Sequence, residues 1–123
     1  MNHTNYLFPF EKLEIWKLSI EIAETLYKVT NDFPTEEKYG ITSQLRRAGN
    51  SIGANIAEGS ARFSEKDKAR FIEISFGSLM EVAHFLYLSN TLGYLSNENL
   101  SNLKPRILEM SNKINAYHKK LNK

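Results

Sequence analysis

The chain has 123 residues, which is enough for one domain with its own hydrophobic core. Its hydrophobic content of 41% and charged content of 24% are ordinary for a globular domain, and its net charge of +2 excludes a strong polycation. It has no cysteine, which excludes disulfides, thiolate metal sites and cysteine nucleophiles. No apolar run approaches the roughly 18 residues of a membrane span, and residues 1–10 do not resemble a signal peptide. We therefore expect a soluble, cytoplasmic domain with no membrane contact.

The N-terminal part of the chain contains an expected arm and the first expected helix. Residues 1–10 are expected to form an extended arm, because Pro9 disfavours helix at the residue before it. Over residues 11–31, apolar side chains such as Leu13 and Trp16 recur three and four positions apart, which is the helical period. Further apolar residues widen this face, so we expect the helix to pack against more than one neighbour.

The second helix is expected over residues 35–60. Pro34 breaks the first helix, and Thr35 is suited to cap the N-terminus of the second. Gly59, near its end, stands where helices often place a left-handed residue. The stretch carries an apolar row, a polar row and a row of small residues side by side, each at spacings of three and four.

Two further helices are expected over residues 64–91 and 97–121, each with a serine as its N-cap. Pro105 falls within the fourth helical pattern and is expected to delay or kink its start. No alternation typical of a strand competes with these patterns. The sequence therefore predicts an all-α fold, an antiparallel up-down-up-down four-helix bundle that covers residues 11–121.

Two rows of the second helix are candidates for specific contacts. The small-residue row is Gly49, Gly53 and Ala57, and an interior glycine costs a helix about 1 kcal/mol relative to alanine. We expect this row to permit the close approach of another backbone. The polar row is expected to form a network, with one acid of the third helix, that fixes helix register. The members of this network are Gln44, Ser51, Asn55, Glu58 and Glu81.

Two short motifs give the sequence a specific resemblance. They are SQLRRA at residues 43–48 and NIAEG at residues 55–59, and flanking matches extend over residues 10–120. With these motifs the chain resembles the bacterial four helix bundle protein family, also called the 23S rRNA intervening-sequence protein family. That resemblance implies an antiparallel four-helix bundle that assembles into a ring-like homopentamer.

The resemblance also implies two settings for function. Some members of this family are encoded in insertions within 23S rRNA genes, and related proteins are accessory subunits of diversity-generating retroelements. In those retroelements a basic pentamer engages nucleic acid and the reverse transcriptase. At +2 per chain, the present sequence is far less basic than those accessory proteins.

Arg46 and Arg47 are the sharpest candidates for a binding site, and two interpretations of them stay open. In the first they bind phosphate groups; in the second they are structural. The structural interpretation pairs Arg47 with Glu58 or Glu81 and pairs Arg46 across a subunit boundary. We favour it because the polar row supplies partners. The full set of candidates for nucleic-acid contact is Arg46, Arg47, Arg62, Arg70, Lys119 and Lys120.

The sequence contains no recognisable motif for catalysis or for a cofactor. It has no phosphate-binding loop, no dinucleotide fingerprint and no nucleophile elbow. A carboxylate metal site of the di-iron type needs Glu-x-x-His pairs, and the sequence has none. We therefore expect no catalytic residue, no metal and no cofactor.

These observations lead to two hypotheses about function. We predict a non-enzymatic scaffold that forms a homo-oligomer, and by the resemblance a homopentamer. The alternative is an RNA-binding accessory protein that uses basic residues on the surface of the oligomer. A protein partner is a further option for a scaffold whose net charge is this small.

Overall fold

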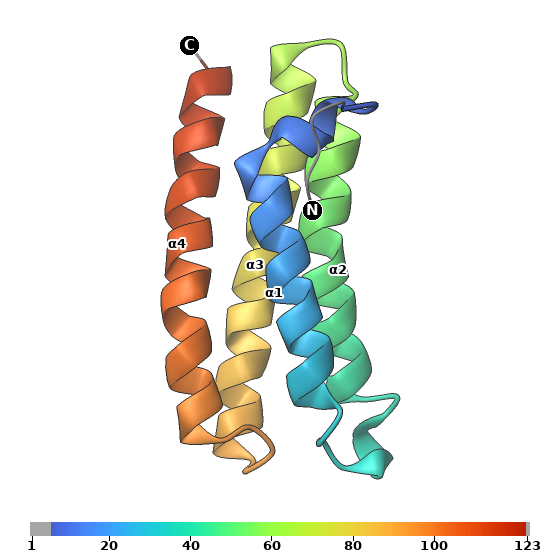
Figure 1. The fold of residues 1–123 in the computed structure, drawn as a ribbon, viewed down its shortest axis with the longest axis vertical. Helices are drawn as coiled ribbons and strands as arrows, with labels where there is room; N and C mark the ends of the chain where they lie inside the picture. Colours follow the sequence, from blue (N-terminus) through green and yellow to red (C-terminus); the bar gives the residue numbers. More distant parts are fainter. Residues whose placement is uncertain (1–5, 123) are drawn as a thin grey trace.

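Four helices make up most of the computed structural model, which describes residues 6–122 (Figure 1). They are α1 (Glu14–Thr30), α2 (Ile41–Ser60), α3 (Glu65–Thr91) and α4 (Asn97–Leu121), with short 3-10 turns η1 (Pro9–Lys12) and η2 (Thr35–Glu37). Successive helices run in opposite directions along the long axis of the molecule. Residues 6–122 contain no strand. The predicted all-α, up-down-up-down bundle is confirmed.

The four helices are arranged so that neighbours in the chain are also neighbours in space. Contact is most extensive between α2 and α3, and least extensive between α1 and α4. Within the described residues no close backbone contact joins the diagonal pairs, α1 with α3 or α2 with α4. Each helix therefore packs against two neighbours and leaves one side open.

The interior is filled by aliphatic side chains that recur at the predicted helical spacing. Leu45, Ile52 and Ile56 of α2 are fully buried, as are Leu79 and Val82 of α3. Truncating a buried side chain of this size to alanine costs about 2–5 kcal/mol of stability. The apolar rows of the sequence thus supply the core of the bundle.

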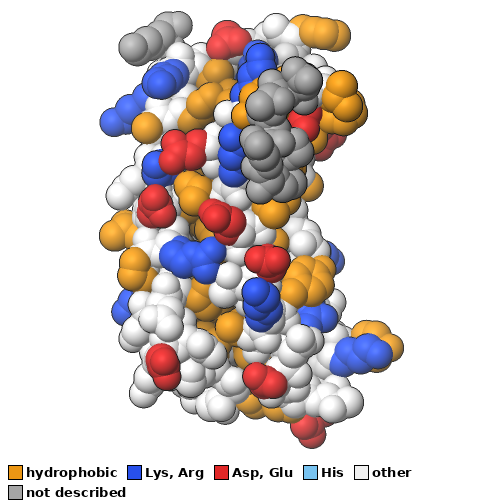
Figure 2. All heavy atoms as spheres, in the orientation of Figure 1, with side chains coloured by type: hydrophobic (Ala, Val, Ile, Leu, Met, Phe, Trp, Pro, Cys, Tyr) orange, Lys and Arg blue, Asp and Glu red, His pale blue; other side chains and the backbone are white. Residues whose placement is uncertain are grey.

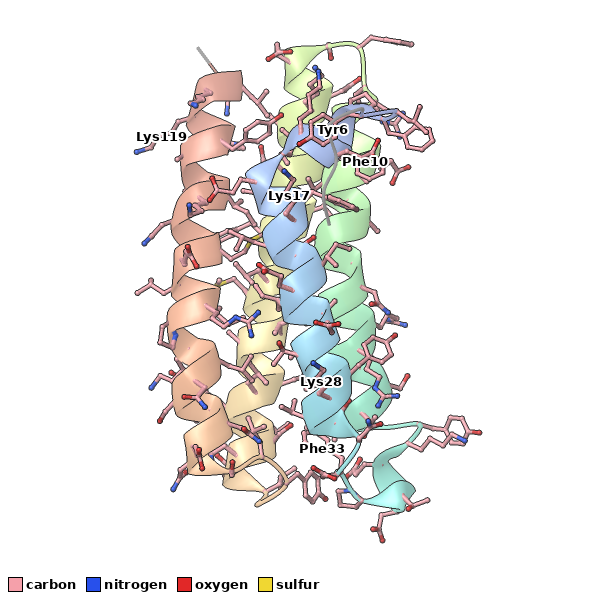
Figure 3. The ribbon with its side chains drawn as sticks, in the orientation of Figure 1. Tyr6, Phe10, Lys17, Lys28, Phe33 and Lys119 are labelled. Carbon is pink, nitrogen blue, oxygen red and sulfur yellow. The ribbon has the colours of Figure 1, made fainter. Side chains whose placement is uncertain are left out.

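The first helix begins later than predicted, at Glu14 instead of residue 11. The residues before it form η1, and the ring of Phe10 lies edge-on to the ring of Trp16 with centroids 4.7 Å apart. The last residue of the predicted arm, Phe10, therefore packs on the bundle instead of extending from it (Figure 3). Residues 1–5 of that arm lie outside the described residues.

The second helix also begins later, at Ile41 instead of residue 35, and Thr35 does not cap it. The side chain of Phe33 is buried, with its ring centroid 5.9 Å from that of Tyr94, so the chain must turn before the helix can start. Glu37 takes the place of a cap, because its carboxylate accepts a hydrogen bond from the Ile41 backbone N–H at 3.3 Å.

The prediction for Gly59 was wrong, and so was one of the two alternatives for Pro105, a delayed start of its helix. Gly59 is helical rather than left-handed, and a Cβ at this position would lie only 2.7 Å from the Cβ of Phe71. Among the described residues the positive φ belongs to Gly93 instead, at 83°. Pro105 lies inside α4 and does not delay its start, which is at Asn97.

By length and composition alone, α3 is apolar enough to cross a membrane. An 18-residue window within it has a mean hydropathy of 1.3, even though charged and polar residues interrupt it. However, α3 packs between α2 and α4, and the core helix of a bundle meets the same criterion. One helix of this kind is weak evidence for membrane insertion.

Candidate functional site

The small-residue row of α2 faces α1 of the same chain. A Cβ at Gly53 would lie 2.5 Å from the Ser19 Oγ, and a Cβ at Gly49 would lie 2.6 Å from the Leu26 Cδ1. Ser19 is itself buried, and its hydroxyl donates a hydrogen bond to the Trp16 carbonyl at 2.5 Å. The close approach is therefore between two helices of one chain.

A small pocket remains beside this row, between η1, α1 and α2. Its volume is about 200 Å³, and its walls include Phe10, Trp16, Ala54 and Ala57. Ala57, the third member of the row, is half-buried there. Pockets that hold drug-sized ligands are larger, at about 300–1,000 Å³. The row is therefore explained by helix packing without a ligand.

Only part of the predicted polar row forms a network. The Asn55 amide donates to the hydroxyl and carbonyl oxygens of Ser51 at 2.9 and 2.8 Å, and the Ser78 hydroxyl donates to the Ser51 hydroxyl at 2.8 Å. The fully buried Ser75 hydroxyl donates to the Ile52 carbonyl at 2.7 Å. The hydrogen bonds of Ser75 and Ser78 join α2 to α3 and hold one register between them.

Sequence reasoning assigned the α3 member of this network to Glu81, which is exposed, and missed Ser75 and Ser78. Ser75 and Ser78 stand in a row of the third helix that is otherwise apolar, so the sequence pattern indicated that they belong to the core. Their small side chains let α2 approach α3 closely, in agreement with the extensive contact between these helices. Two serines three positions apart within a core row are the signal that would have identified them.

The remaining members of the polar row lie in solvent. Gln44, Glu58 and Glu81 are exposed. Glu58 forms a salt bridge with Arg62 at 3.3 Å, one turn further along. Arg47 is exposed and forms no salt bridge within the described residues. Its predicted pairing with Glu58 or Glu81 was therefore wrong.

Arg46 is held at the C-terminal end of α1. Its Nε donates to the Thr30 Oγ1 at 2.8 Å, and its Nη2 donates to the Tyr27 carbonyl at 3.4 Å and the Asn31 Oδ1 at 3.3 Å. Its guanidinium also lies 4.7 Å from the centroid of the Tyr27 ring. A cation at this place complements the negative end of the helix dipole. Arg46 thus has partners within its own chain.

The six candidate cations do not form one cluster. Arg46 and Arg47 lie near the start of α2, whereas Arg62 and Arg70 lie beyond its end, roughly 20 Å of helix away. Lys119 points into solvent at the C-terminal end of α4 (Figure 3). On the face shown in Figure 2, basic and acidic side chains are interspersed. That face therefore presents no continuous basic surface.

Four of the six cations are available to an anionic partner. Arg62 is not among them, because it pairs with Glu58 and its guanidinium lies 4.4 Å from the centroid of the Phe71 ring. The four have exposed side chains that form no hydrogen bond or salt bridge within the described residues. They are Arg47, Arg70, Lys119 and Lys120.

An apolar groove between α3 and α4 was not predicted. Its volume is about 480 Å³, and its walls include Met80 and Tyr87 of α3 and Leu108 of α4. These side chains are 41%, 51% and 62% exposed. Pro105 also lines the groove, and the Nζ of Lys104 lies 5.4 Å from the centroid of the Tyr87 ring. The sequence feature that would have predicted the groove is the presence of apolar residues beside the core rows of both helices.

The described residues offer no metal centre. No group of three or more His, Asp or Glu side chains among residues 6–122 is placed to hold a metal ion. His118 contacts the Glu73 Oε2 at 2.9 Å, and the His84 ring packs edge-on against Phe85. His3 lies outside the described residues.

The fold and these contacts define a small all-α protein, a four-helix bundle in which hydrogen bonds of Arg46, Ser75 and Ser78 join neighbouring helices. Comparison with protein families identifies it further: the profile described as 23S rRNA-intervening sequence protein matches residues 11–116. The chain belongs to this family, which confirms the resemblance found in its sequence.

A solved structure supports the same fold. It is the crystal structure of a protein of unknown function from the S23 ribosomal protein family of Bacteroides thetaiotaomicron. The match has a TM-score of 0.78 and 24% sequence identity, and it covers 85% of this chain and 95% of that one. A search of curated proteins found no match. Nothing in these comparisons points to catalysis.

Proposed function

We propose that this chain is a non-enzymatic scaffold that works as a homo-oligomeric ring, with five copies as the family resemblance implies. The observation that carries the proposal is the apolar groove between α3 and α4. No element of the described chain covers it, and Met80, Tyr87 and Leu108 remain exposed along it. Contiguous apolar surface of this kind marks contacts with other molecules.

A second copy of the chain supplies a suitable occupant for the groove. Leu7 and Phe8 project beside η1 and are 82% and 56% exposed. Phe8 stacks on Phe10 with centroids 5.8 Å apart, and Phe10 packs on Trp16, so the projection is held in place. We infer that each copy places its projection in the groove of the next copy, not in a reciprocal exchange between two copies, so the contact is heterologous. Heterologous contacts produce a ring when their rotation closes.

Light scattering after size-exclusion chromatography tests the ring. At low protein concentration, where weak contacts between rings are broken, we expect a wild-type mass of about five times 14.2 kDa. Leu108→Glu places a charge in the groove and should reduce the mass to two chains or fewer. Tyr39→Glu changes an aromatic residue that is 89% exposed outside the groove, and it should leave the mass unchanged. A wild-type protein that is folded and monomeric at every concentration would contradict the proposal.

Binding of nucleic acid is a second candidate function, and the four unpaired cations favour it. A ring of five chains would carry a net charge of about +10 and would repeat each of these cations five times. Such a surface attracts phosphate through release of counterions, so its affinity for RNA should fall steeply with salt.

Mixed-sequence RNA added to the same light-scattering experiment at low salt tests this candidate. An increase in mass that salt reverses is the expected result. Arg47→Ala and Lys119→Ala should each weaken binding to all sequences alike and leave folding unchanged. Arg46→Ala is unsuitable as a probe, because it also removes contacts with α1. A mass that does not change when RNA is added would contradict nucleic-acid binding. A protein would then remain as the class of partner for the scaffold.

A further inference from the structure

The outward side of α3 carries a regular pattern that the bundle does not use. Seven residues of α3 recur at alternating spacings of four and three, which is the period of a helix that pairs with another helix, and Phe63 precedes the helix at the same spacing. All eight are exposed, while the residues between them include the buried core of α3. We call them the α3 outer row: Phe63, Asp67, Arg70, Ile74, Gly77, Glu81, His84 and Leu88.

Gly77 stands at the middle of this row without an explanation inside the chain. A Cβ added there would meet nothing within 4 Å, whereas a Cβ at Gly49, Gly53 or Gly59 would collide with a neighbour. Glycine in a helix interior weakens the helix relative to alanine, and here no internal packing requires it. Beside it, Ile74 is 43% exposed.

The charged residues of the row also lack partners. Asp67, Arg70, Glu81 and His84 form no salt bridge within the described residues, although the His84 ring packs on Phe85. Two of these side chains are acidic and two are basic or able to become so. The face is therefore mixed in charge, unlike a surface shaped for a polyanion.

We infer that the α3 outer row is a contact between two copies of this chain, in which the two α3 helices pair antiparallel about a two-fold axis. Such an axis, placed midway between Ile74 and Gly77, pairs the isoleucine of one copy with the glycine of the other. Each remaining residue meets the one at an equal distance on the other side of the axis. These pairs are Arg70 with Glu81, Asp67 with His84, and Phe63 with Leu88.

Every layer of this pairing is complementary. The Ile74 side chain occupies the space that Gly77 of the partner subunit leaves open. On either side of it an acidic side chain meets an arginine or a histidine. At both ends Leu88, which is 36% exposed, lies toward Phe63, which precedes α3 and is 105% exposed. A parallel pairing would instead set Arg70 against its own copy and glycine against glycine, with like charges together and a central void. The row is thus complementary to itself when it runs in the opposite direction, and this favours a second copy of the chain over an unrelated protein.

The inference does not rest on the proposed ring. The α3 side of the groove is formed by Met80 and Tyr87, about a quarter of a turn around the helix from the outer row. The groove contact is heterologous, whereas the outer-row contact is isologous and stops at two copies. If both occur, the outer row joins chains of two different rings.

The full chain carrying Leu108→Glu is the starting protein for the test, because the groove contact is then removed. We expect sedimentation velocity over a concentration series to show a monomer–dimer equilibrium. Arg70→Glu turns two attractive pairs into two repulsive ones and should raise the dimer dissociation constant about tenfold or more. Adding Glu81→Arg to it should restore the original constant, since both pairs then re-form with reversed sign.

This rescue separates a contact between copies from an effect within one chain. Residues 70 and 81 are about 16 Å apart along one helix, too far to pair with each other. A protein that stays monomeric in the Leu108→Glu background, or a double variant no better than Arg70→Glu, would overturn the inference. Neither result would bear on the ring, which the wild-type mass tests separately.

Gly77 gives a second, independent readout. Gly77→Leu should weaken dimerisation as strongly as charge reversal, because its side chain meets Ile74 of the partner subunit. The same change should not lower the melting temperature of the monomer, since the position faces open space. Unchanged dimerisation of Gly77→Leu would overturn the packing at the centre of the pairing.

Discussion

Glycine occupies two different environments in the central helices of this bundle. In α2, Gly49, Gly53 and Gly59 each face another part of the chain at a distance that leaves no room for a methyl group. In α3, Gly77 faces open space. The α2 glycines are explained by the close packing of α2 against α1 and α3. No contact within the chain explains Gly77 of α3. We therefore look for its explanation in a contact with another molecule.

Two adjacent arginines show the same contrast. Arg46 is hydrogen-bonded to the last turn of α1, whereas Arg47, the next residue, is exposed and unpaired among the described residues. A step of one residue turns a side chain about 100° around a helix, so neighbours in sequence face different surroundings. In both comparisons, the residue with a partner in the chain stabilises the fold, and the other is free for contacts with other molecules.

The largest effect is expected for Gly53→Leu. Its side chain would enter the space of Ser19 and push α1 away from α2, so we expect the free energy of unfolding to fall by about 3 kcal/mol or more. The matched change Gly77→Leu should not lower it, because the position faces open space, and Gly77→Ala should raise it by up to about 1 kcal/mol, because alanine favours helix. Urea denaturation at low protein concentration measures all three. Equal losses at the two positions would remove the contrast between α2 and α3.

A smaller effect is expected for Arg46→Ala. It removes the hydrogen bonds to Thr30 and Tyr27 at the end of α1, and because the site is half-exposed we expect a loss of about 1–2 kcal/mol. The control Arg47→Ala should change stability by no more than about 0.5 kcal/mol. The melting temperatures of the two variants measure and compare these losses of stability. If Arg47→Ala were the more damaging, our assignment of the two arginines would be reversed.

The architecture was predictable because helical period and breaking residues are local properties of a sequence. Leu45, Ile52 and Ile56 recur at a spacing that only a helix places on one side, and all three are fully buried. The start of α2 was not predictable in this way. It depends on the burial of Phe33 against Tyr94 and on the Glu37 carboxylate, which are contacts of the folded chain.

The candidate site was harder to predict, since a helical row shows that residues share a side but not what covers it. The polar row looked uniform in sequence, yet Ser51 is hydrogen-bonded to Ser78 of α3 while Gln44 lies in solvent. The groove lined by Met80 and Leu108 likewise depends on how α3 and α4 sit together. Which side of a helix stays open is decided by the packing of all four helices.

The smallest effect concerns a contact that ties two connections of the bundle together. The Tyr94 hydroxyl donates a hydrogen bond to the Glu37 Oε2 at 3.0 Å, which joins the α3–α4 connection to the α1–α2 connection. This hydrogen bond, with a smaller contribution from burial, raises the pKa of Tyr94 above its ordinary value of 10.0. We expect Tyr94→Phe to lower the melting temperature slightly at neutral pH, and Tyr39→Phe, at an exposed position, to leave it unchanged.

The pH dependence of this variant distinguishes the hydrogen bond from simple packing of the ring. The pKa of Tyr94 is higher in the folded chain than in the unfolded one, so the contact stabilises the fold fully below pH 10.0. That stabilisation is lost as the pH rises through the folded-state pKa, because a tyrosinate cannot donate and is repelled by Glu37. The difference in melting temperature between wild type and Tyr94→Phe should therefore shrink in alkaline solution. A difference that stays constant with pH would show that the ring, and not its hydroxyl, joins the two connections.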